Sequence, residues 1–381
     1  MELGGPHSAV HSFNPLSLTI AREYRGLLKN ELAAKLEVTP SAITQFESGA
    51  ARPNAATLAR AAVVLGFPLA FFSTRPRLAP VLMDQCHFRS LRSTTQHDRR
   101  RMLATASLLR ALVEYIDDRV NLPVEDLTPL RRTADTTEDI EVLAGDVRNA
   151  WQLGSGPIPA LLTLFESHGV VAFRVPSDCD KVDAFSFWHK DRPFIFLNSD
   201  KGSSSRSRFD AAHELGHLLL HVDCVPGDLS QEQQAHRFAG AFLMPRAVIL
   251  RELPSRMSWP HLFELKKRWG VSLAALLRRG YDLGIYSDAT YRRANTYLSS
   301  KGWKTKEPAE PEHETPELVR DSLSALISAG ISAAAISADL ALTTSILNDL
   351  VLAAENEEQN MLSFSNVLDI RRTNNRSKER E

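Results

Sequence analysis

Two histidines and a glutamate form the part of this sequence best suited to chemistry. His213, Glu214 and His217 follow the pattern H-E-x-x-H. Side chains four residues apart lie on one face of a helix, so both imidazoles can reach the same ion. Imidazole nitrogen suits zinc, and a catalytic zinc site uses three protein ligands and a water molecule. Glu214 would lie near that water and take its proton, because zinc brings the pKa of the water toward neutrality.

The residues around the motif favour a buried helix over a surface helix that carries the pattern by chance. The predicted helix is strongly apolar, with Ala211, Ala212, Leu215 and Leu218 to Leu220. Gly216 leaves space beside the metal. This setting supports a metal site inside the protein.

Three residues that follow the motif are candidates for the third metal ligand. Asp223 stands six residues after His217, but Leu220 occupies the position where such sites need a glycine to turn the chain. His221 lies one helical turn beyond His217, which is too far along to join the first two histidines. Glu232 opens a second stretch with apolar residues at helical spacing. A helix packed beside the first could aim Glu232 at the metal, so Glu232 is favoured over Asp223.

Three elements of the sequence together resemble the ImmA/IrrE family of zinc metallopeptidases. They are His213-Glu214-x-x-His217, the downstream Glu232, and the run Leu243-Met244-Pro245. The likeness covers about residues 137 to 285 and includes the upstream segments Trp151 to Ile158, Asp183 to Ser186 and Pro193 to Asn198. It implies one zinc ion per chain, bound by His213, His217 and Glu232, and peptide-bond hydrolysis with Glu214 as the base. Gln234 stands where relatives often have a second Glu, but this position is not expected to bind metal.

Residues 16 to 72 are predicted to form four short helices, and a three-residue turn joins the second to the third. Thr39 can cap the third helix, Pro40 suits its first position, and Gly49 ends it. Two short helices joined in this way describe a helix-turn-helix. Its expected core is Leu32, Ala33, Leu36, Val38, Ile43 and Phe46. The outward side chains of the third helix are short polar groups that can hydrogen-bond base edges in a major groove, namely Ser41, Thr44 and Gln45.

The stretch from Glu31 to Ala59 resembles the Xre/Cro-type phage-repressor domain, which implies binding to double-stranded operator DNA. Four basic side chains are expected to contact phosphates, namely Arg22, Arg25, Lys29 and Arg52. Lys29 stands where many members have Gln. A lysine at this position can still contact a phosphate, but not with the geometry of the Gln contact. The favoured DNA-contacting set is Lys29, Ser41, Thr44, Gln45 and Arg52. The alternative is a helical module that only binds protein or dimerises.

Composition and charge limit the class of protein. The chain has 381 residues, of which 43% are hydrophobic and 24% charged, as is ordinary for a globular protein of two or three domains. The net charge is −1, so any nucleic-acid-binding surface has to be local. The three cysteines, Cys86, Cys179 and Cys224, are far apart and fit a reducing cytoplasm. Neither a signal peptide nor a membrane partner is expected, because the longest uncharged run, Ser322 to Ala338, is weakly apolar.

These patterns predict a mainly α fold of the α+β kind: an N-terminal helix-turn-helix bundle, a central zincin-like peptidase domain with a small β-sheet, and a C-terminal helical region. Strands are expected at 170–175, 184–188 and 193–198, and their sheet offers an edge on which an extended peptide could lie. A loop at 201–207 is expected to lead into the metal helix. Residues 97 to 120 are expected to form one long helix, used for core packing, as a rigid spacer or as a dimer seam. The predicted parts are a flexible tail (1–15), the helix-turn-helix domain (16–73), a basic flank and long linker helix (74–136), the peptidase domain (137–285), a linker (286–316), a helical module (317–360) and a disordered tail (361–381).

The combination predicts a cytoplasmic regulator that binds DNA and hydrolyses peptide bonds. Relatives of the ImmA/IrrE kind cut a repressor of the Xre type and thereby switch on genes of mobile elements or stress responses. The expected substrate is such a repressor, a toxin, or this chain itself, and a homodimer would read paired half-sites. A different hypothesis is a non-catalytic repressor or antitoxin whose zinc fold senses a ligand or holds a partner. A third is a housekeeping peptidase in which the N-terminal helices select the substrate.

Overall fold

The computed structural model describes residues 12–73, 78–88, 95–175, 184–198, 203–222, 224 and 228–352. The chain divides into two compact units. The first unit contains Met1–Pro80, Arg100–Asn121 and Thr315–Glu381, and the second contains Val81–Arg99 and Leu122–Glu314. The predicted helix-turn-helix therefore lies in the first unit, and the H-E-x-x-H motif lies in the second.

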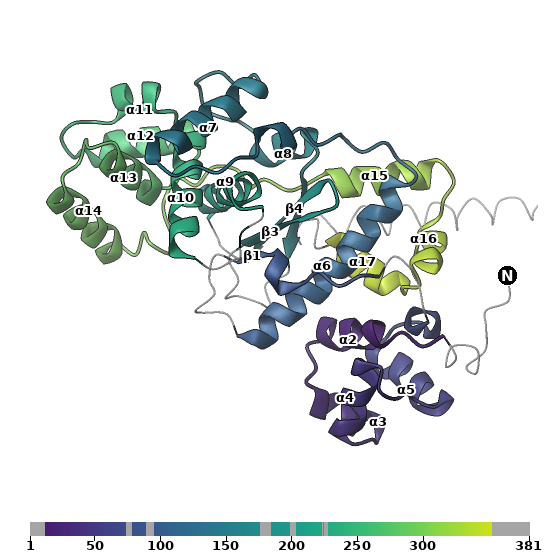
Figure 1. The fold of residues 1–381 in the computed structure, drawn as a ribbon. Coiled ribbons are helices and arrows are strands. Elements are labelled where there is room, and N and C mark those ends of the chain that lie inside the picture. The colour runs from purple at the N-terminus through teal and green to yellow at the C-terminus, as the bar shows by residue number, and fades with distance from the viewer. Residues whose placement is uncertain are drawn as a thin grey trace, which may run out of the picture. The chain divides into compact units, whose positions relative to one another are not determined.

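The first unit is built from short helices and most of one long helix (Figure 1). They are α2 (Pro15–Tyr24), α3 (Lys29–Leu36), α4 (Pro40–Ser48), α5 (Ala55–Leu65), the 3-10 helix η1 (Leu69–Phe72), α6 (Gln96–Asp117), α15 (Leu318–Ser328), α16 (Ala333–Leu340) and α17 (Thr344–Leu352). Tyr115 of α6 donates its hydroxyl to Asp339 of α16 at 3.1 Å, so the long helix packs within this unit. This contact favours the core-packing interpretation of α6.

The turn chemistry expected for the helix-turn-helix is confirmed. Thr39 accepts a hydrogen bond from the Ala42 amide at 3.2 Å, and Pro40 opens α4. Gly49 ends α4 with φ +76°, a conformation that costs glycine nothing because it lacks a Cβ. Four of the six expected core residues are buried and two are half-buried, namely Leu32, Ala33, Leu36 and Ile43, then Val38 and Phe46.

A buried ion pair ties α2 to α4. Arg22 Nε donates to Glu47 at 2.5 Å, and each side chain is 5% exposed. Nη1 of the same guanidinium donates to the Leu27 carbonyl at 2.8 Å. This buried, charge-assisted hydrogen bond holds α4 on α2. The expectation that Arg22 contacts a phosphate is wrong, because its guanidinium is enclosed by these partners.

The second unit contains a four-stranded sheet with the order β1-β3-β4-β2. The strands are β1 (His87–Phe88), β2 (Val171–Val175), β3 (Ala184–His189) and β4 (Arg192–Asn198). β3 and β4 pair antiparallel, and β2 joins the other side of β4 in parallel. The three expected strands are confirmed. β1 lies in the stretch expected to be only a basic flank, and its two residues are too few to leave a periodic pattern in the sequence.

β1 extends the sheet beside β3. It pairs antiparallel with β3, with His87 opposite Ser186 and Phe88 opposite Phe185. An extended peptide was expected to lie on an edge of this sheet. Beside β3, the chain's own segment forms the added strand.

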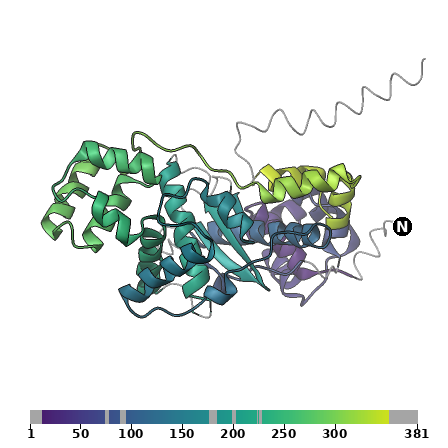
Figure 2. The same ribbon diagram turned by 90° about the horizontal axis from the view of Figure 1, so that it is seen from above.

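The second unit also contains eight α-helices and two 3-10 helices among its described residues. They are α7 (Thr137–Ala150), α8 (Leu161–Ser167), α9 (Ser204–Leu220), α10 (Leu229–Leu243), α11 (Arg246–Glu252), α12 (Trp259–Trp269), α13 (Leu273–Asp282) and α14 (Asp288–Ser300), with the 3-10 helices η2 (Met83–Gln85) and η3 (Thr128–Leu130). Figure 2 shows the green helices α11 to α14 gathered to one side of the sheet.

The metal helix α9 begins earlier than expected. The loop expected at 201–207 is helical from Ser204 onward. The Ser205 amide donates to Glu310 at 2.8 Å, so a carboxylate far along the chain satisfies a backbone donor of the first turn. The sequence around Ser205 does not predict this contact, because Glu310 lies far along the chain.

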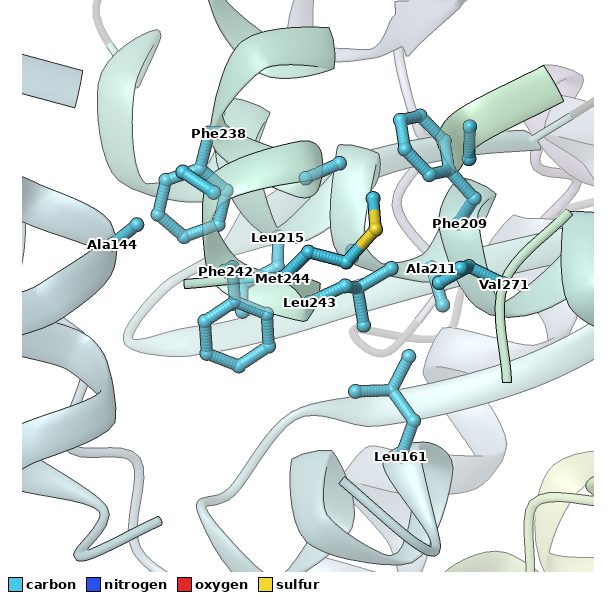
Figure 3. Close-up of a cluster of buried hydrophobic side chains, with 14 of the residues drawn as sticks. Ala144, Leu161, Phe209, Ala211, Leu215, Phe238, Phe242, Leu243, Met244 and Val271 are labelled. Atoms are coloured by element: carbon cyan, nitrogen blue, oxygen red, sulfur yellow. The ribbon is translucent and has the colours of Figure 1, made fainter. Parts of the chain in front are cut away.

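One apolar core joins α7, α8, α9, α10 and one face of the sheet. Figure 3 shows Phe238 and Phe242 of α10 beside Leu215 of α9, with Ala144 of α7 on their other side. All four residues are buried. The core therefore presses α10 against the helix that carries the H-E-x-x-H motif.

Gly216 sets how closely α10 can approach α9. A Cβ at this position would lie 3.1 Å from the Phe238 ring and 3.2 Å from Cα of Ala235. The space expected beside the metal is thus filled by the backbone of the neighbouring helix. Since Ala235 lies three residues after Glu232, the close approach also brings that carboxylate toward α9.

Among the described residues, no single helix is long and apolar enough to cross a membrane. The helices α15 and α16 satisfy that criterion only when they are joined, and they are bent by 112° at the break between them.

We expect Gly216→Val to weaken both the fold and metal binding. The added side chain must displace Phe238 or the backbone of α10, and such overpacking typically costs about 1–3 kcal/mol of unfolding free energy. Urea unfolding and zinc titration measure the two effects. Gly145→Val is the matched control, because an added Cβ there meets no atom within 4 Å. An unchanged unfolding midpoint in Gly216→Val would contradict the close packing of the two helices.

Candidate functional site

Three side chains converge between α9 and α10. His213 Nε2 and His217 Nε2 are 3.1 Å apart. Glu232 places Oε2 3.4 Å from His213 Nε2 and Oε1 3.4 Å from His217 Nε2. Both histidines are buried, and Glu232 is partly exposed. In the part of the chain that the structure describes, these residues form a group of potential metal ligands within 4.8 Å of one another.

The ligand atoms fit a tetrahedral metal centre. With metal–nitrogen distances of about 2.0–2.1 Å, two ligands of a tetrahedral ion lie about 3.3 Å apart. The observed separations of 3.1 and 3.4 Å bracket this value. Two imidazoles and one carboxylate leave one of four positions for a water molecule, which is the pattern of catalytic rather than structural zinc sites.

Glu232 supplies the negative charge of this group. Burial raises the pKa of its carboxyl, but hydrogen bonds and charge interactions with His213 and His217 outweigh burial and lower the pKa to about 2. The carboxyl is therefore ionised at neutral pH. An ionised oxygen is the form that binds a cation.

Glu214 follows His213 on α9 and lies inside the protein. Its side chain is fully buried and accepts a hydrogen bond from Ser186 Oγ of β3 at 2.7 Å. Ser186 was not among the residues predicted to act at the site. Alternation along β3 places Ala184, Ser186 and Trp188 on one face, and Trp188 Nε1 donates to the Leu218 carbonyl of α9 at 3.0 Å. That alternation was the available indication that Ser186 faces the metal helix.

A second layer of polar contacts orients His217. Its Nδ1 lies 3.0 Å from Nδ1 of His221, whose Nε2 lies 2.8 Å from Oε1 of Gln234. The Gln234 amide donates in turn to the Ala134 carbonyl at 2.8 Å. Burial lowers the pKa of His221 to about 4, so this ring is neutral at pH 7. Such outer contacts fix the orientation of a ligating imidazole.

The three candidates for the third ligand differ in their positions relative to His213 and His217. Glu232 joins the two motif histidines, as favoured. His221 stays outside that group, as expected, but it contacts His217 rather than serving no purpose. Asp223 lies outside the described residues. Gln234, which departs from the family pattern, contacts His221 and is not part of the group His213, His217 and Glu232.

The predicted base-reading side chains lie on the surface of α4. Ser41, Thr44 and Gln45 are all exposed, as a helix inserted into a groove requires. The Thr44 hydroxyl donates to the Pro40 carbonyl at 3.2 Å, so it would have to rotate to meet a base. Ile43 is the buried residue of α4 and faces the core, so these three side chains lie on the other side of the helix.

The basic side chains around α4 differ in their surroundings. Arg52 is exposed. Lys29 is half-buried, and its Nζ lies 3.3 Å from the Glu47 carboxylate that also binds Arg22. Arg25 is exposed, but its Nε donates to the Leu65 carbonyl at 2.7 Å. The residues predicted to contact phosphates therefore do not form one uniform basic surface.

Two family models match the chain. Residues 18–72 match the model described as helix-turn-helix. Residues 165–280 match a peptidase model described as an IrrE N-terminal-like domain, and this range contains Glu214, His213, His217 and Glu232. No curated protein matches the chain. The two matches agree with the two family resemblances read from the sequence.

We expect His221→Ala to lower zinc affinity about 10–100-fold, the usual effect of removing an outer contact of a ligating histidine. Competition with a chelator of known affinity measures the change. His261→Ala is the control, because His261 is exposed on α12 and its Nε2 lies 2.9 Å from the Glu252 carbonyl. Equal affinities of the His221 variant and the wild type would show that His217 needs no such support.

Proposed function

Because the chain joins a helix-turn-helix domain to an ImmA/IrrE-type metallopeptidase-like domain, we propose that it is a DNA-binding transcriptional regulator and a zinc-dependent endopeptidase. Its proposed substrate is a repressor-type protein or a second copy of this chain. Cleavage would control stress-response or mobile-element genes. The observation that carries the proposal is the buried Glu214 carboxylate beside the group His213, His217 and Glu232.

The chemistry divides between the bound ion and the protein. Zinc at this position supplies the acidity that activates a water molecule and polarises a peptide carbonyl. His213, His217 and Glu232 would hold it. Glu214 takes the proton of the water and delivers it to the leaving amine. The Ser186 hydroxyl holds one oxygen of Glu214, so the carboxylate keeps one orientation while the proton moves.

The helix-turn-helix would direct this activity to an operator. Ser41, Thr44 and Gln45 of α4 are proposed to contact bases, and Lys29 and Arg52 to contact phosphates. A homodimer would place two copies of α4 on paired half-sites. Because both functions belong to one chain, cleavage and operator occupancy can respond to the same event.

A second candidate function is a non-catalytic repressor or antitoxin whose zinc-peptidase-like domain senses a ligand or holds a partner protein. The pairing of β1 with β3 at Ser186 favours it, because the chain's own strand takes part of the sheet edge next to Glu214. The buried Glu214 favours the enzyme, since a purely structural zinc site needs no base.

We expect the wild type to hold about one zinc ion per chain, and Glu214→Gln to keep it while losing cleavage by roughly 10²–10⁴-fold, the contribution of a general base. Glu232→Ala should lose the zinc. Metal analysis measures the zinc content of each protein. Mass spectrometry of the chain, incubated alone and with a peptide pool, measures cleavage. Glu264→Gln is the control, because Glu264 is exposed on α12. A Glu214→Gln protein that still cleaves would remove Glu214 from the mechanism, and a wild type without zinc or cleavage would leave the second candidate.

We expect Gln45→Ala to relax operator recognition at one base pair, at a cost of about 1–3 kcal/mol for that pair. Duplexes selected from a random pool by the wild-type chain provide the operator. Binding is then compared for the selected duplex and its single-base variants. Val63→Ala, on the exposed side of α5, is the control. Identical base preferences in Gln45→Ala and the wild type would exclude Gln45 from base contact.

A further inference from the structure

A cavity of about 520 Å³ lies in the second unit between four helices. Its wall includes Arg206 and Asp210 of α9, His236 of α10, Arg278 of α13, and Tyr291 and Asn295 of α14. This volume is within the range of ligand-binding pockets and is large enough for an amino-acid side chain with its neighbouring backbone.

The cavity begins next to the metal centre. His236 lies one helical turn after Glu232 on α10, and its ring centroid is 6.4 Å from that of His213. The same ring is 4.8 Å from the ring of Phe209, which lies one turn before His213 on α9 and also lines the cavity. A peptide with its scissile bond at the metal group would therefore place a neighbouring residue at this cavity.

The exposed charges in the cavity wall are positive. The side chains of Arg206 and Arg278 are 26% and 35% exposed. Their carboxylate partners are less exposed, with Asp282 at 13% and Glu307 at 0%, and Asp210 in the wall is 3% exposed. A ligand in the cavity thus meets guanidinium groups more readily than carboxylates.

Both guanidinium groups are held in place and keep donors for a ligand. Nε of Arg278 donates to Asp282 at 2.9 Å, and Nη2 of Arg206 donates to the Trp303 carbonyl at 2.8 Å. A guanidinium has five N–H donors in a fixed fork that matches the two oxygens of a carboxylate. Because the bonds to Asp282 and Trp303 order the side chains, less conformational entropy is lost when a carboxylate binds.

We propose that this cavity binds a carboxylate of the peptide substrate, from a Glu or Asp side chain or from a free C-terminus, and that Arg206 and Arg278 select it. The inference rests on the proposed peptidase function and adds its substrate class. Tyr291 and Asn295 lie beyond residue 280, where the match to the peptidase family model ends. Part of the pocket wall therefore lies outside the residues that match the family model.

The test uses the full-length Glu214→Gln chain loaded with zinc, which retains peptides without cutting them. The probe is a pool of random octapeptides, acetylated and amidated at their ends, and a second pool with free C-termini. Retained peptides are identified by mass spectrometry. We expect Glu and Asp to be enriched over Gln and Asn about threefold to fivefold, the range for a partly exposed ion pair. Enrichment confined to the free-acid pool, without a side-chain preference, would identify the C-terminus as the source.

Arg278→Met and Arg206→Met, made separately in the same background, should each reduce the carboxylate preference. Arg292→Met is the matched control, because Arg292 is exposed on α14 and does not line the cavity. Zinc-dependent retention with no preference for carboxylates, or a preference that both cavity variants keep, would overturn the proposal and leave the peptidase function standing. Absence of zinc-dependent retention together with absence of cleavage by the unsubstituted chain would overturn both.

Discussion

The close approach of α10 to α9 is the contact on which the candidate site depends. Spacing along one helix brings two imidazoles together, but the third ligand comes from a different helix. Because Gly216 has no side chain, the backbone at Ala235 can lie close to α9. The aromatic rings of α10 fill the space around this contact. That packing carries Glu232 to within 3.4 Å of both histidines. The convergence of these three side chains is thus a consequence of how tightly two apolar helices pack.

The site also places two carboxylates in the protein interior, where an unpaired charge is strongly destabilising. Glu214 is fully buried and Glu232 is partly so, and an isolated carboxylate in such surroundings would be strongly destabilising. Glu214 receives a hydrogen bond from Ser186, and Glu232 lies against two imidazoles. A divalent cation bound by His213, His217 and Glu232 would offset the remaining negative charge.

The two units solve different recognition problems with different surfaces. In the first unit, the buried Arg22–Glu47 pair holds α4 on α2, so the polar side chains of α4 are presented by a rigid support. In the second unit, a cavity begins next to the group His213, His217 and Glu232 and is lined by the partly exposed Arg206 and Arg278. The segment Val81–Arg99, which follows the helix-turn-helix in the sequence, belongs to the second unit and contributes β1 to its sheet.

The sequence by itself determined the local features of this protein. H-E-x-x-H, the cap at Thr39, the glycine at 49 and the exposed polar set on α4 follow from spacing within a few residues, because helix geometry places such side chains without reference to the rest of the chain. The mainly α fold with a small sheet followed from the same periodicities.

Only the tertiary structure decided which distant groups meet. The enclosure of Arg22, the Ser186–Glu214 bond, the Gln234–His221–His217 contacts and the two-residue strand β1 each join segments that are not neighbours in the sequence. Such contacts depend on how apolar surfaces pack, and that packing leaves no local pattern at either partner.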